Sequence, residues 1–225
     1  MIDGDGTEPR DAEQYFASRP GSPTRPRIVR AVLAGRPVEL ATDAGVFSAD
    51  RLDPGTRILL DKAPAPPGSG VFLDLGCGYG PLTLALALAR PTAEVWGVDV
   101  NTRALALARR NADAAGVGDQ VRLVTPEEVP VSLRVDLVWS NPPIRVGKPE
   151  LHRLLAAALG TLSPSGYAAL VVSRHLGADS LSAWLGRQGW VVRRVASAQG
   201  YRVLVVEDPG SSTDGPRFAP GAYDR

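Results

Sequence analysis

The sequence predicts an α/β fold built on a mostly parallel β-sheet with helices on both of its faces. Short apolar runs of strand length alternate with helical segments between residues 71 and 206, and parallel neighbouring strands require such helical crossovers. Glycines and polar residues follow the first, second and fourth of these strands. Ligands of such sheets bind at the carboxyl ends of the strands, so these residues predict one binding site. A length of 225 residues suits a single domain of this kind.

The composition excludes several classes of protein. Lysine and arginine number 25 against 24 acidic residues, so the net charge of +1 does not by itself indicate a nucleic-acid partner. A single cysteine excludes a disulfide framework and a cysteine-rich zinc site. The sequence has no apolar run of about 20 residues and no signal-peptide pattern. We therefore expect a cytoplasmic protein that binds no metal and no membrane, with a monomer favoured.

The two ends of the sequence differ in composition from its middle. Residues 1–14 are acidic and polar without periodicity, which is typical of a disordered tail, and residues 208–225 are polar and rich in glycine and proline, which predicts a flexible tail. Between them we expect one domain over residues 15–207. It divides into an N-terminal extension (15–62) and a core (71–207), joined by a connection rich in proline and glycine.

A β-hairpin is predicted within the extension. Apolar residues at 28–33 and 38–40 flank the turn sequence Ala34-Gly35-Arg36-Pro37, a pattern that indicates two paired strands. The segment 42–62 contains further apolar residues and is expected to lead into the core.

The core is predicted to alternate strands and helices. Pro81 suits the first turn of a helix because its φ is fixed and its missing N–H has no partner to lose there, and Gly116 ends a helix. The last two strands are expected to pair as an antiparallel hairpin across residues 197–200. The seven predicted strands cover residues 71–75, 93–98, 121–124, 135–140, 167–173, 191–195 and 201–206. The predicted helices cover residues 82–90, 102–115, 150–162 and 180–188.

A glycine-rich turn follows the first core strand. Gly76-Cys77-Gly78-Tyr79-Gly80 lets the backbone turn tightly and lets a ligand approach without a Cβ in the way. Asp99 ends the next strand, where its carboxylate can accept hydrogen bonds from ribose hydroxyls. A glycine turn alone is also compatible with a tight strand–helix connection that binds no ligand.

An acidic residue distinguishes this turn from a dinucleotide-binding one. Asp74 lies two residues before the first glycine, and the glycine spacing is G-x-G-x-G rather than G-x-G-x-x-G. A carboxylate there would repel a pyrophosphate, but it suits a ligand that carries an ammonium group. S-adenosylmethionine has a ribose, an ammonium group and a sulfonium, and it has no phosphate. The turn therefore favours S-adenosylmethionine over NAD.

The sequence Asn141-Pro142-Pro143 follows the fourth core strand. Each proline holds the residue before it out of the α region, so the strand has a stiff, extended exit. The Asn141 amide oxygen and the Pro142 carbonyl can then accept both N–H bonds of a conjugated amine and direct its lone pair at a methyl donor. Preorganised polar groups of this kind contribute roughly 10²–10³ in rate each. In other contexts Asn-Pro-Pro is simply a rigid turn.

These motifs together resemble those of a known family. Residues 74–80, Asp99 and residues 140–143 are similar to the motifs of class I S-adenosylmethionine-dependent methyltransferases that modify amino groups. Residues 42–48, 53–57 and 141–148 narrow the resemblance to the methyltransferase small domain family, in the short single-domain form of the RsmC-like ribosomal RNA guanine-N2 methyltransferases. The resemblance implies a Rossmann-like class I methyltransferase fold, with a seven-stranded sheet whose last strand is antiparallel.

The resemblance also implies roles for individual residues. Asn141 and Pro142 would hold N2 of a guanine in small-subunit ribosomal RNA for direct in-line transfer from S-adenosylmethionine, with Pro143 and Ile144 completing the catalytic loop. The predicted cofactor-binding residues are Asp74, Gly76, Cys77, Gly78, Gly80, Asp99, Val100, Asn101, Phe47, Thr56 and Glu127. The predicted RNA-binding residues, which can contact phosphates, are Arg145, Lys148, Arg27 and Arg30.

Two departures from the family pattern leave other functions open. Related enzymes often carry Phe or Tyr after Asn-Pro-Pro, where an aromatic ring can stack on the target base, and Ile144 offers only apolar contact. Longer members have a second methyltransferase-like domain that is thought to help bind RNA, and we expect none in this sequence. The alternatives are an N-methyltransferase of a small molecule, a protein glutamine or DNA, and a catalytically silent module for RNA binding or assembly.

Overall fold

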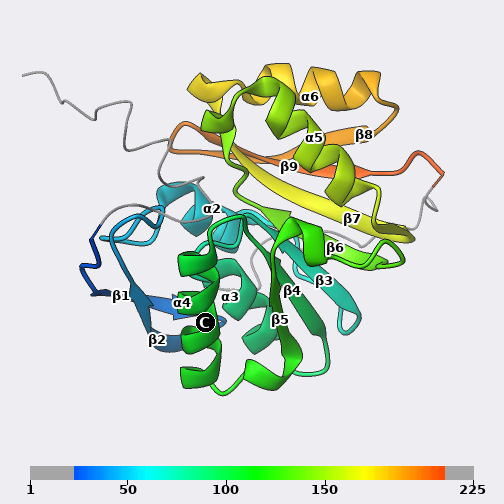
Figure 1. Ribbon diagram of the computed structural model, residues 1–225. Coiled ribbons are helices and arrows are strands. Elements are labelled where there is room, and N and C mark those ends of the chain that lie inside the picture. The colour runs from blue at the N-terminus through cyan, green and yellow to red at the C-terminus, as the bar shows by residue number, and fades with distance from the viewer. Residues whose placement is uncertain (1–22, 211–225) are drawn as a thin grey trace, which may run out of the picture.

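A computed structural model describes residues 23–210 (Figure 1). The tail predicted at residues 1–14 lies outside this range, as does all but the beginning of the tail predicted at 208–225. Within the described residues, no helix is both long enough and apolar enough to cross a lipid bilayer.

A seven-stranded sheet forms the centre of the molecule. Its strand order is β5-β4-β3-β6-β7-β9-β8, and β9 runs antiparallel to both of its neighbours while the other pairs are parallel. The predicted parallel sheet with an antiparallel last strand is confirmed. The strands are β3 (Val71–Leu75), β4 (Glu94–Val98), β5 (Val121–Val124), β6 (Val135–Ser140), β7 (Leu162–Ser173), β8 (Val191–Ala198) and β9 (Tyr201–Glu207).

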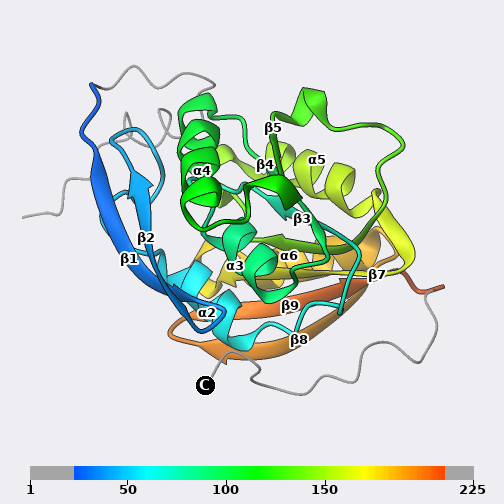
Figure 2. The same ribbon diagram turned by 90° about the horizontal axis from the view of Figure 1, so that it is seen from below.

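Helices cover both faces of this sheet (Figures 1 and 2). One face carries α2 (Pro54–Lys62), α3 (Pro81–Ala89) and α4 (Thr102–Ala114), and the other carries α5 (Lys148–Leu159) and α6 (Ala178–Arg187). Alternate residues of β7 from Tyr167 to Val172 belong to the two apolar cores, because side chains of a strand point to opposite faces. Short 3-10 turns complete the part of the chain that the structure describes: η1 (Gly118–Gln120), η2 (Pro126–Glu128), η3 (Ile144–Val146) and η4 (Arg174–Leu176).

The N-terminal hairpin lies beside α4. Its strands are β1 (Arg27–Leu33) and β2 (Arg36–Thr42), joined by a tight turn with positive φ at Ala34 and Gly35. The buried side chain of Asn111 on α4 accepts from the Ala41 N–H at 2.7 Å and donates to the Ala41 carbonyl at 2.9 Å. Asn111 also donates to the Tyr79 carbonyl, so one residue joins the hairpin to the glycine-rich turn.

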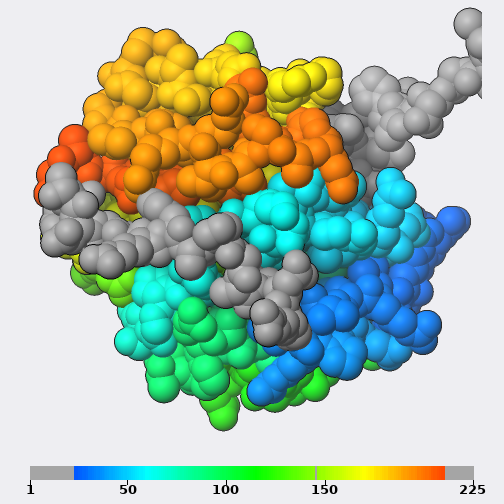
Figure 3. Space-filling model, turned by 180° about the vertical axis from the view of Figure 1, so that it is seen from behind, coloured from blue at the N-terminus to red at the C-terminus, as the bar shows by residue number. Residues whose placement is uncertain are grey.

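Helix α2 was not predicted as a helix. Asp53 caps its first turn by accepting the Thr56 N–H at 3.0 Å, and Pro54 occupies the first helical position. An N-cap aspartate followed by proline is a sequence signal for a helix start, so this element was detectable. The helix packs against β7, β8 and β9, and on the rear surface it lies between the hairpin and the last two strands (Figure 3).

Candidate active site

A pocket of about 410 Å³ opens at the carboxyl ends of β3, β4 and β6. The sheet topology therefore brings together the motifs that follow three separate strands, as expected for this type of fold. The predicted site residues that line the pocket are Phe47, Thr56, Gly76, Cys77, Gly78, Asp99, Val100, Asn101, Asn141, Pro142, Pro143 and Ile144.

The glycine-rich turn is fixed by backbone hydrogen bonds to β4. The N–H groups of Gly76 and Cys77 both donate to the Val98 carbonyl, at 2.8 and 3.0 Å. Gly76 and Gly78 have φ values of 76° and 55°, which side-chain-bearing residues adopt only with strain. A Cβ at Gly78 would have no atom within 4 Å. The turn thus presents bare backbone to the pocket.

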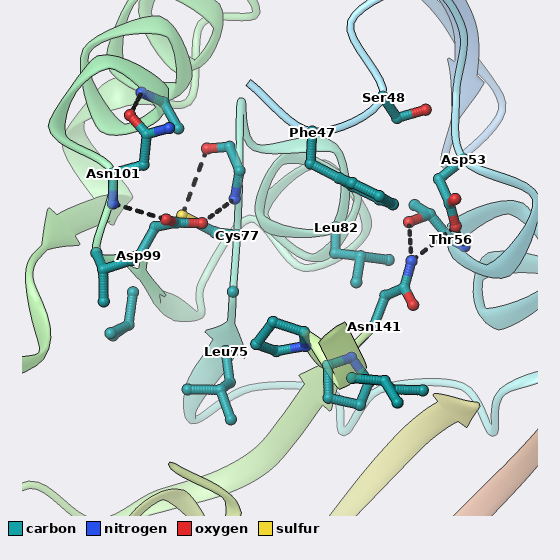
Figure 4. A pocket seen from close by; sticks show the side chains of 18 of the residues that line it. Phe47, Ser48, Asp53, Thr56, Leu75, Cys77, Leu82, Asp99, Asn101 and Asn141 are labelled. Carbon is teal, nitrogen blue, oxygen red and sulfur yellow. Dashed lines mark hydrogen bonds between the residues drawn. The ribbon is translucent and has the colours of Figure 1, made fainter. Parts of the chain in front are cut away.

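Asp99 organises the turn through its two carboxylate oxygens. Its Oδ2 accepts from the Gly78 N–H and its Oδ1 accepts from the Asn101 N–H, both at 2.8 Å (Figure 4). Burial raises the pKa of Asp99, and the backbone hydrogen bonds oppose that shift. Each oxygen can accept a further hydrogen bond, so the carboxylate suits a ligand that carries a ribose diol.

Asp74 lies beneath the pocket and does not line it. Its Oδ2 accepts from the Thr83 hydroxyl at 2.6 Å, while its Oδ1 is enclosed without a hydrogen-bond partner among the described residues. Burial raises the pKa of Asp74 to about 7, the negative charge of Asp99 adds to the shift, and hydrogen bonds from Thr83 oppose it. A buried carboxylate oxygen without a partner suits a cationic ligand group.

Replacing Asp74 by Asn should make the stability of the ligand-free protein less dependent on pH. The pKa of the Asp74 carboxyl is about 7 in the folded protein, against an ordinary value of 3.8. Between these values the folded state retains a proton that the unfolded state releases, so the free energy of unfolding falls as pH rises through about 7. Asn cannot ionise. In urea titrations, the natural protein should lose on the order of 2 kcal/mol more than Asp74→Asn between about pH 5 and pH 8; parallel pH profiles would contradict this.

Two other predicted cofactor residues lie outside the pocket lining. Gly80 caps α3 with a φ of 93°, and a Cβ there would lie 3.0 Å from Leu84 Cδ1 and 3.1 Å from Ala108 Cβ. Its lack of a side chain therefore serves the close approach of α3 to α4. Glu127 is exposed in η2, and its neighbour Pro126 reaches the pocket instead.

The side chain of Asn141 is held in one orientation. Its Nδ2 donates to Asp53 Oδ1 at 2.7 Å and to the Thr56 hydroxyl at 3.1 Å. An ionised carboxylate only accepts hydrogen bonds, so the nitrogen of the amide must face Asp53. Figure 4 shows the amide oxygen turned away from both partners. That oxygen is therefore available as an acceptor.

The residues after Asn141 form a tight turn. Pro143 has φ −74° and ψ 73°, and the Pro142 carbonyl accepts from the Ile144 N–H at 2.8 Å, the pattern of an inverse γ-turn. A carbonyl oxygen has two lone pairs, so one remains for a ligand. The Asn141 amide and the Pro142 carbonyl thus each retain an acceptor position.

The predicted RNA-binding residues lie in two parts of the fold, the N-terminal hairpin and the segment that follows the Asn-Pro-Pro turn. Arg27 pairs with Asp50, and Arg30 Nε donates to Glu39 at 2.9 Å on the exposed hairpin. Lys148 begins α5 and is exposed, and Arg145 lies in η3 directly after the Asn-Pro-Pro turn. A role for these residues in RNA binding stays a prediction.

Sequence reasoning missed several residues that line the pocket. Tyr201 at the start of β9 is one, and burial together with the nearby charge of Asp53 raises its pKa. Leu176 of η4 is another, and it is half exposed. No local signal marks either residue, because Leu176 follows the end of β7 and Tyr201 begins β9, and the two segments meet only where these strands pair. Asp53 also lines the pocket, and a local signal does mark it, because an aspartate followed by proline is typical of a helix start.

The fold and the site are those of a class I S-adenosylmethionine-dependent methyltransferase. The parallel sheet with antiparallel β9, the bare glycine turn and Asp99 define that class. The chain belongs to the methyltransferase small domain family, which it matches over residues 37–205.

Three similar proteins illustrate the family. The uncharacterized protein YbxB of Bacillus subtilis is 30% identical over 196 residues, which cover 86% of this chain and 97% of that protein. Ribosomal RNA large subunit methyltransferase G of Streptomyces avermitilis is 39% identical over 151 residues, which cover 64% of this chain and 39% of that protein. The structure of the Thermus thermophilus 16S rRNA N2 methyltransferase RsmC with AdoMet and guanosine is 25% identical with a TM-score of 0.63, over 83% of this chain and 51% of that chain. This chain thus spans about half or less of the two named enzymes.

Proposed function

We propose that this protein transfers a methyl group from S-adenosylmethionine to the exocyclic N2 of a guanine in small-subunit ribosomal RNA. The observation that carries the proposal is the fixed Asn141 amide: Asp53 and Thr56 hold its nitrogen, and its oxygen accepts no hydrogen bond from the described residues. An acceptor oxygen at the end of β6 suits an amine that donates N–H bonds. The similarity to an RsmC structure that contains guanosine supports guanine as the base.

The pocket suits the cofactor on chemical grounds. Gly76 and Gly78 leave backbone uncovered, and Asp99 offers two acceptor oxygens to a ribose. The enclosed Oδ1 of Asp74 is a group that a ligand ammonium would satisfy if it reached beneath the turn. When bound, S-adenosylmethionine supplies a methyl group on a sulfonium that is open to attack by a nucleophile.

The chain's own residues would prepare the amine for this attack. The exocyclic amine of guanine is a poor nucleophile because its lone pair is delocalised into the ring. Asn141 Oδ1 and the Pro142 carbonyl would accept its two N–H bonds, which turns the lone pair toward the methyl group and stabilises positive charge that develops on nitrogen. The methylated nitrogen is acidic and releases its proton without a strong base.

Large-subunit ribosomal RNA is the second candidate substrate. The 39% identity to ribosomal RNA large subunit methyltransferase G over 151 residues favours it. The chemistry at the amine would be the same for both RNAs. Surfaces outside the pocket would therefore determine which subunit's RNA is methylated.

Transfer of radiolabelled methyl from S-adenosylmethionine tests the proposal. The acceptors are naked ribosomal RNA, assembled small and large subunits, and bulk protein, and nuclease digestion identifies the labelled base. We expect label in N2-methylguanine of small-subunit RNA. Label only in large-subunit RNA would establish the second candidate. Label in protein alone, or in no pool despite calorimetric binding of S-adenosylmethionine, would overturn the proposal.

A further inference from the structure

The backbone alone does not determine whether Asn141 turns its amide oxygen or its amide nitrogen toward the pocket. Pro142 restricts the backbone of Asn141, but the torsions of the asparagine side chain remain free. Rotation about its last torsion exchanges the amide oxygen and nitrogen, and these have opposite hydrogen-bonding character. An amide nitrogen turned toward an amine would set donor against donor. The proposed chemistry therefore requires a device that selects one orientation.

We propose that Asp53 and Thr56 are positioning residues that keep the oxygen of Asn141 turned toward the acceptor amine. This inference rests on the proposed function. The Asp53 carboxylate lies 2.7 Å from the Asn141 nitrogen, and the Thr56 hydroxyl oxygen lies 3.1 Å from it. With the amide reversed, the Asn141 oxygen would face the Asp53 carboxylate, and two acceptors would meet. The wrong orientation is thus disfavoured and the correct one is hydrogen-bonded.

Asp53 is itself held by the start of α2. The oxygen that contacts Asn141 also accepts the Thr56 N–H at 3.0 Å, and Pro54 fixes the first turn. The helix is anchored to the core by the buried residues Ile58 and Leu59. Supporting groups on rigid, packed elements position a site more accurately than groups on loops. The end of β6 and the start of α2, 88 residues apart in sequence, thus form one unit.

The space around this contact leaves no room for an added side chain. A Cβ at Gly55 would lie 2.9 Å from Asp53 Oδ1, 3.0 Å from Tyr201 Cε1 and 3.3 Å from Asn141 Nδ2. Alanine is a better helix former than glycine, so helix propensity alone favours Gly55→Ala. We expect this variant instead to displace Asp53 from Asn141 and to lower kcat.

Asp53→Ser separates the positioning role from the capping role. Serine retains an oxygen that caps a helix, but its side chain is one bond shorter and does not reach Asn141. We expect kcat for RNA methylation to fall roughly 10- to 100-fold, the loss associated with a hydrogen bond to a charged group. The Kd for S-adenosylmethionine should stay within about threefold. Ile58→Val, a core change in the same helix that destabilises modestly, should leave kcat unchanged.

Thr56→Val tests the second contact. Valine has a similar shape, lacks the hydroxyl that accepts from Asn141, and keeps the backbone N–H that Asp53 caps. We expect a smaller loss in kcat, roughly 2- to 10-fold, as for a neutral hydrogen bond.

A double-mutant cycle with Asn141→Ala decides whether Asp53 acts through Asn141. Radiolabelled S-adenosylmethionine keeps low rates measurable. If Asp53 acts only by positioning the amide, Asp53→Ser should have no further effect on kcat once Asn141 is alanine. An equal loss in both backgrounds, or full activity of Asp53→Ser, would overturn the inference. Full activity of Asn141→Ala would instead overturn the proposed function, so the two failures are distinguishable.

Discussion

Replacing Asn141 by Ala is expected to lower the rate of methyl transfer by roughly 10²–10³-fold. The variant removes the side-chain oxygen that would accept one N–H bond of the target amine, and the Pro142 carbonyl cannot replace it. The Asn141 nitrogen contacts Asp53 and Thr56 rather than the glycine-rich turn. The affinity for S-adenosylmethionine should therefore stay within a few-fold.

Single-turnover methylation measures the rate of methyl transfer by Asn141→Ala, and calorimetry separately measures its affinity for S-adenosylmethionine. The rate is compared at saturating RNA and cofactor, and the Kd for S-adenosylmethionine is measured without RNA. Thermal unfolding controls for loss of structure, since the variant also removes a partner of Asp53. If Asn141→Ala weakened cofactor binding as much as it slowed transfer, Asn141 would be a cofactor-binding residue and its proposed role would be wrong.

The second large effect is expected at Asp99. Asp99→Ala removes both oxygens that accept from the Gly78 and Asn101 N–H groups, and it removes the acceptors available to a ribose. Hydrogen bonds to a charged group contribute about 1.5–3 kcal/mol each. We expect the Kd for S-adenosylmethionine to rise by roughly 10- to 100-fold or more, because each 1.4 kcal/mol is tenfold.

Calorimetric titration of S-adenosylmethionine checks this expectation. Asp99→Asn keeps one acceptor oxygen, so its Kd should lie between those of the natural protein and Asp99→Ala. Asp119→Ala removes an exposed carboxylate in η1, away from the pocket lining, and serves as the matched control. Equal affinities for Asp99→Ala and this control would show that the carboxylate does not bind the cofactor.

Several features of the fold follow from local sequence. The apolar runs of 71–75 and 135–140 become buried strands, because side-chain periodicity and length are properties of a short segment. Gly76 and Gly78 adopt positive φ where glycine is the residue that allows it. The stiffness after Asn141 likewise comes from the two prolines that follow it. One pocket at the ends of three strands then follows from parallel topology.

Other features depend on contacts between distant segments. Asp74 can be identified in the sequence as an acidic residue before the glycine-rich turn. Its burial, which raises its pKa, results from the packing of the surrounding elements. The sequence pattern predicts Gly80 as part of a ligand-binding loop. In the structure, the close packing of Leu84 and Ala108 leaves little room for a side chain at this position. Burial and close approach are set by all the elements around a residue, so no local pattern encodes them.

The sequence by itself therefore determined the order of strands and helices after residue 71, the glycine turn and the Asn-Pro-Pro exit, because each is a property of adjacent residues. Only the tertiary structure decided how Asn141 is oriented. Its partners Asp53 and Thr56 precede it by more than 80 residues, and they meet it because α2 packs against β7, β8 and β9. Hydrogen bonds act over about 3 Å in space, and the fold decides which residues come within that distance.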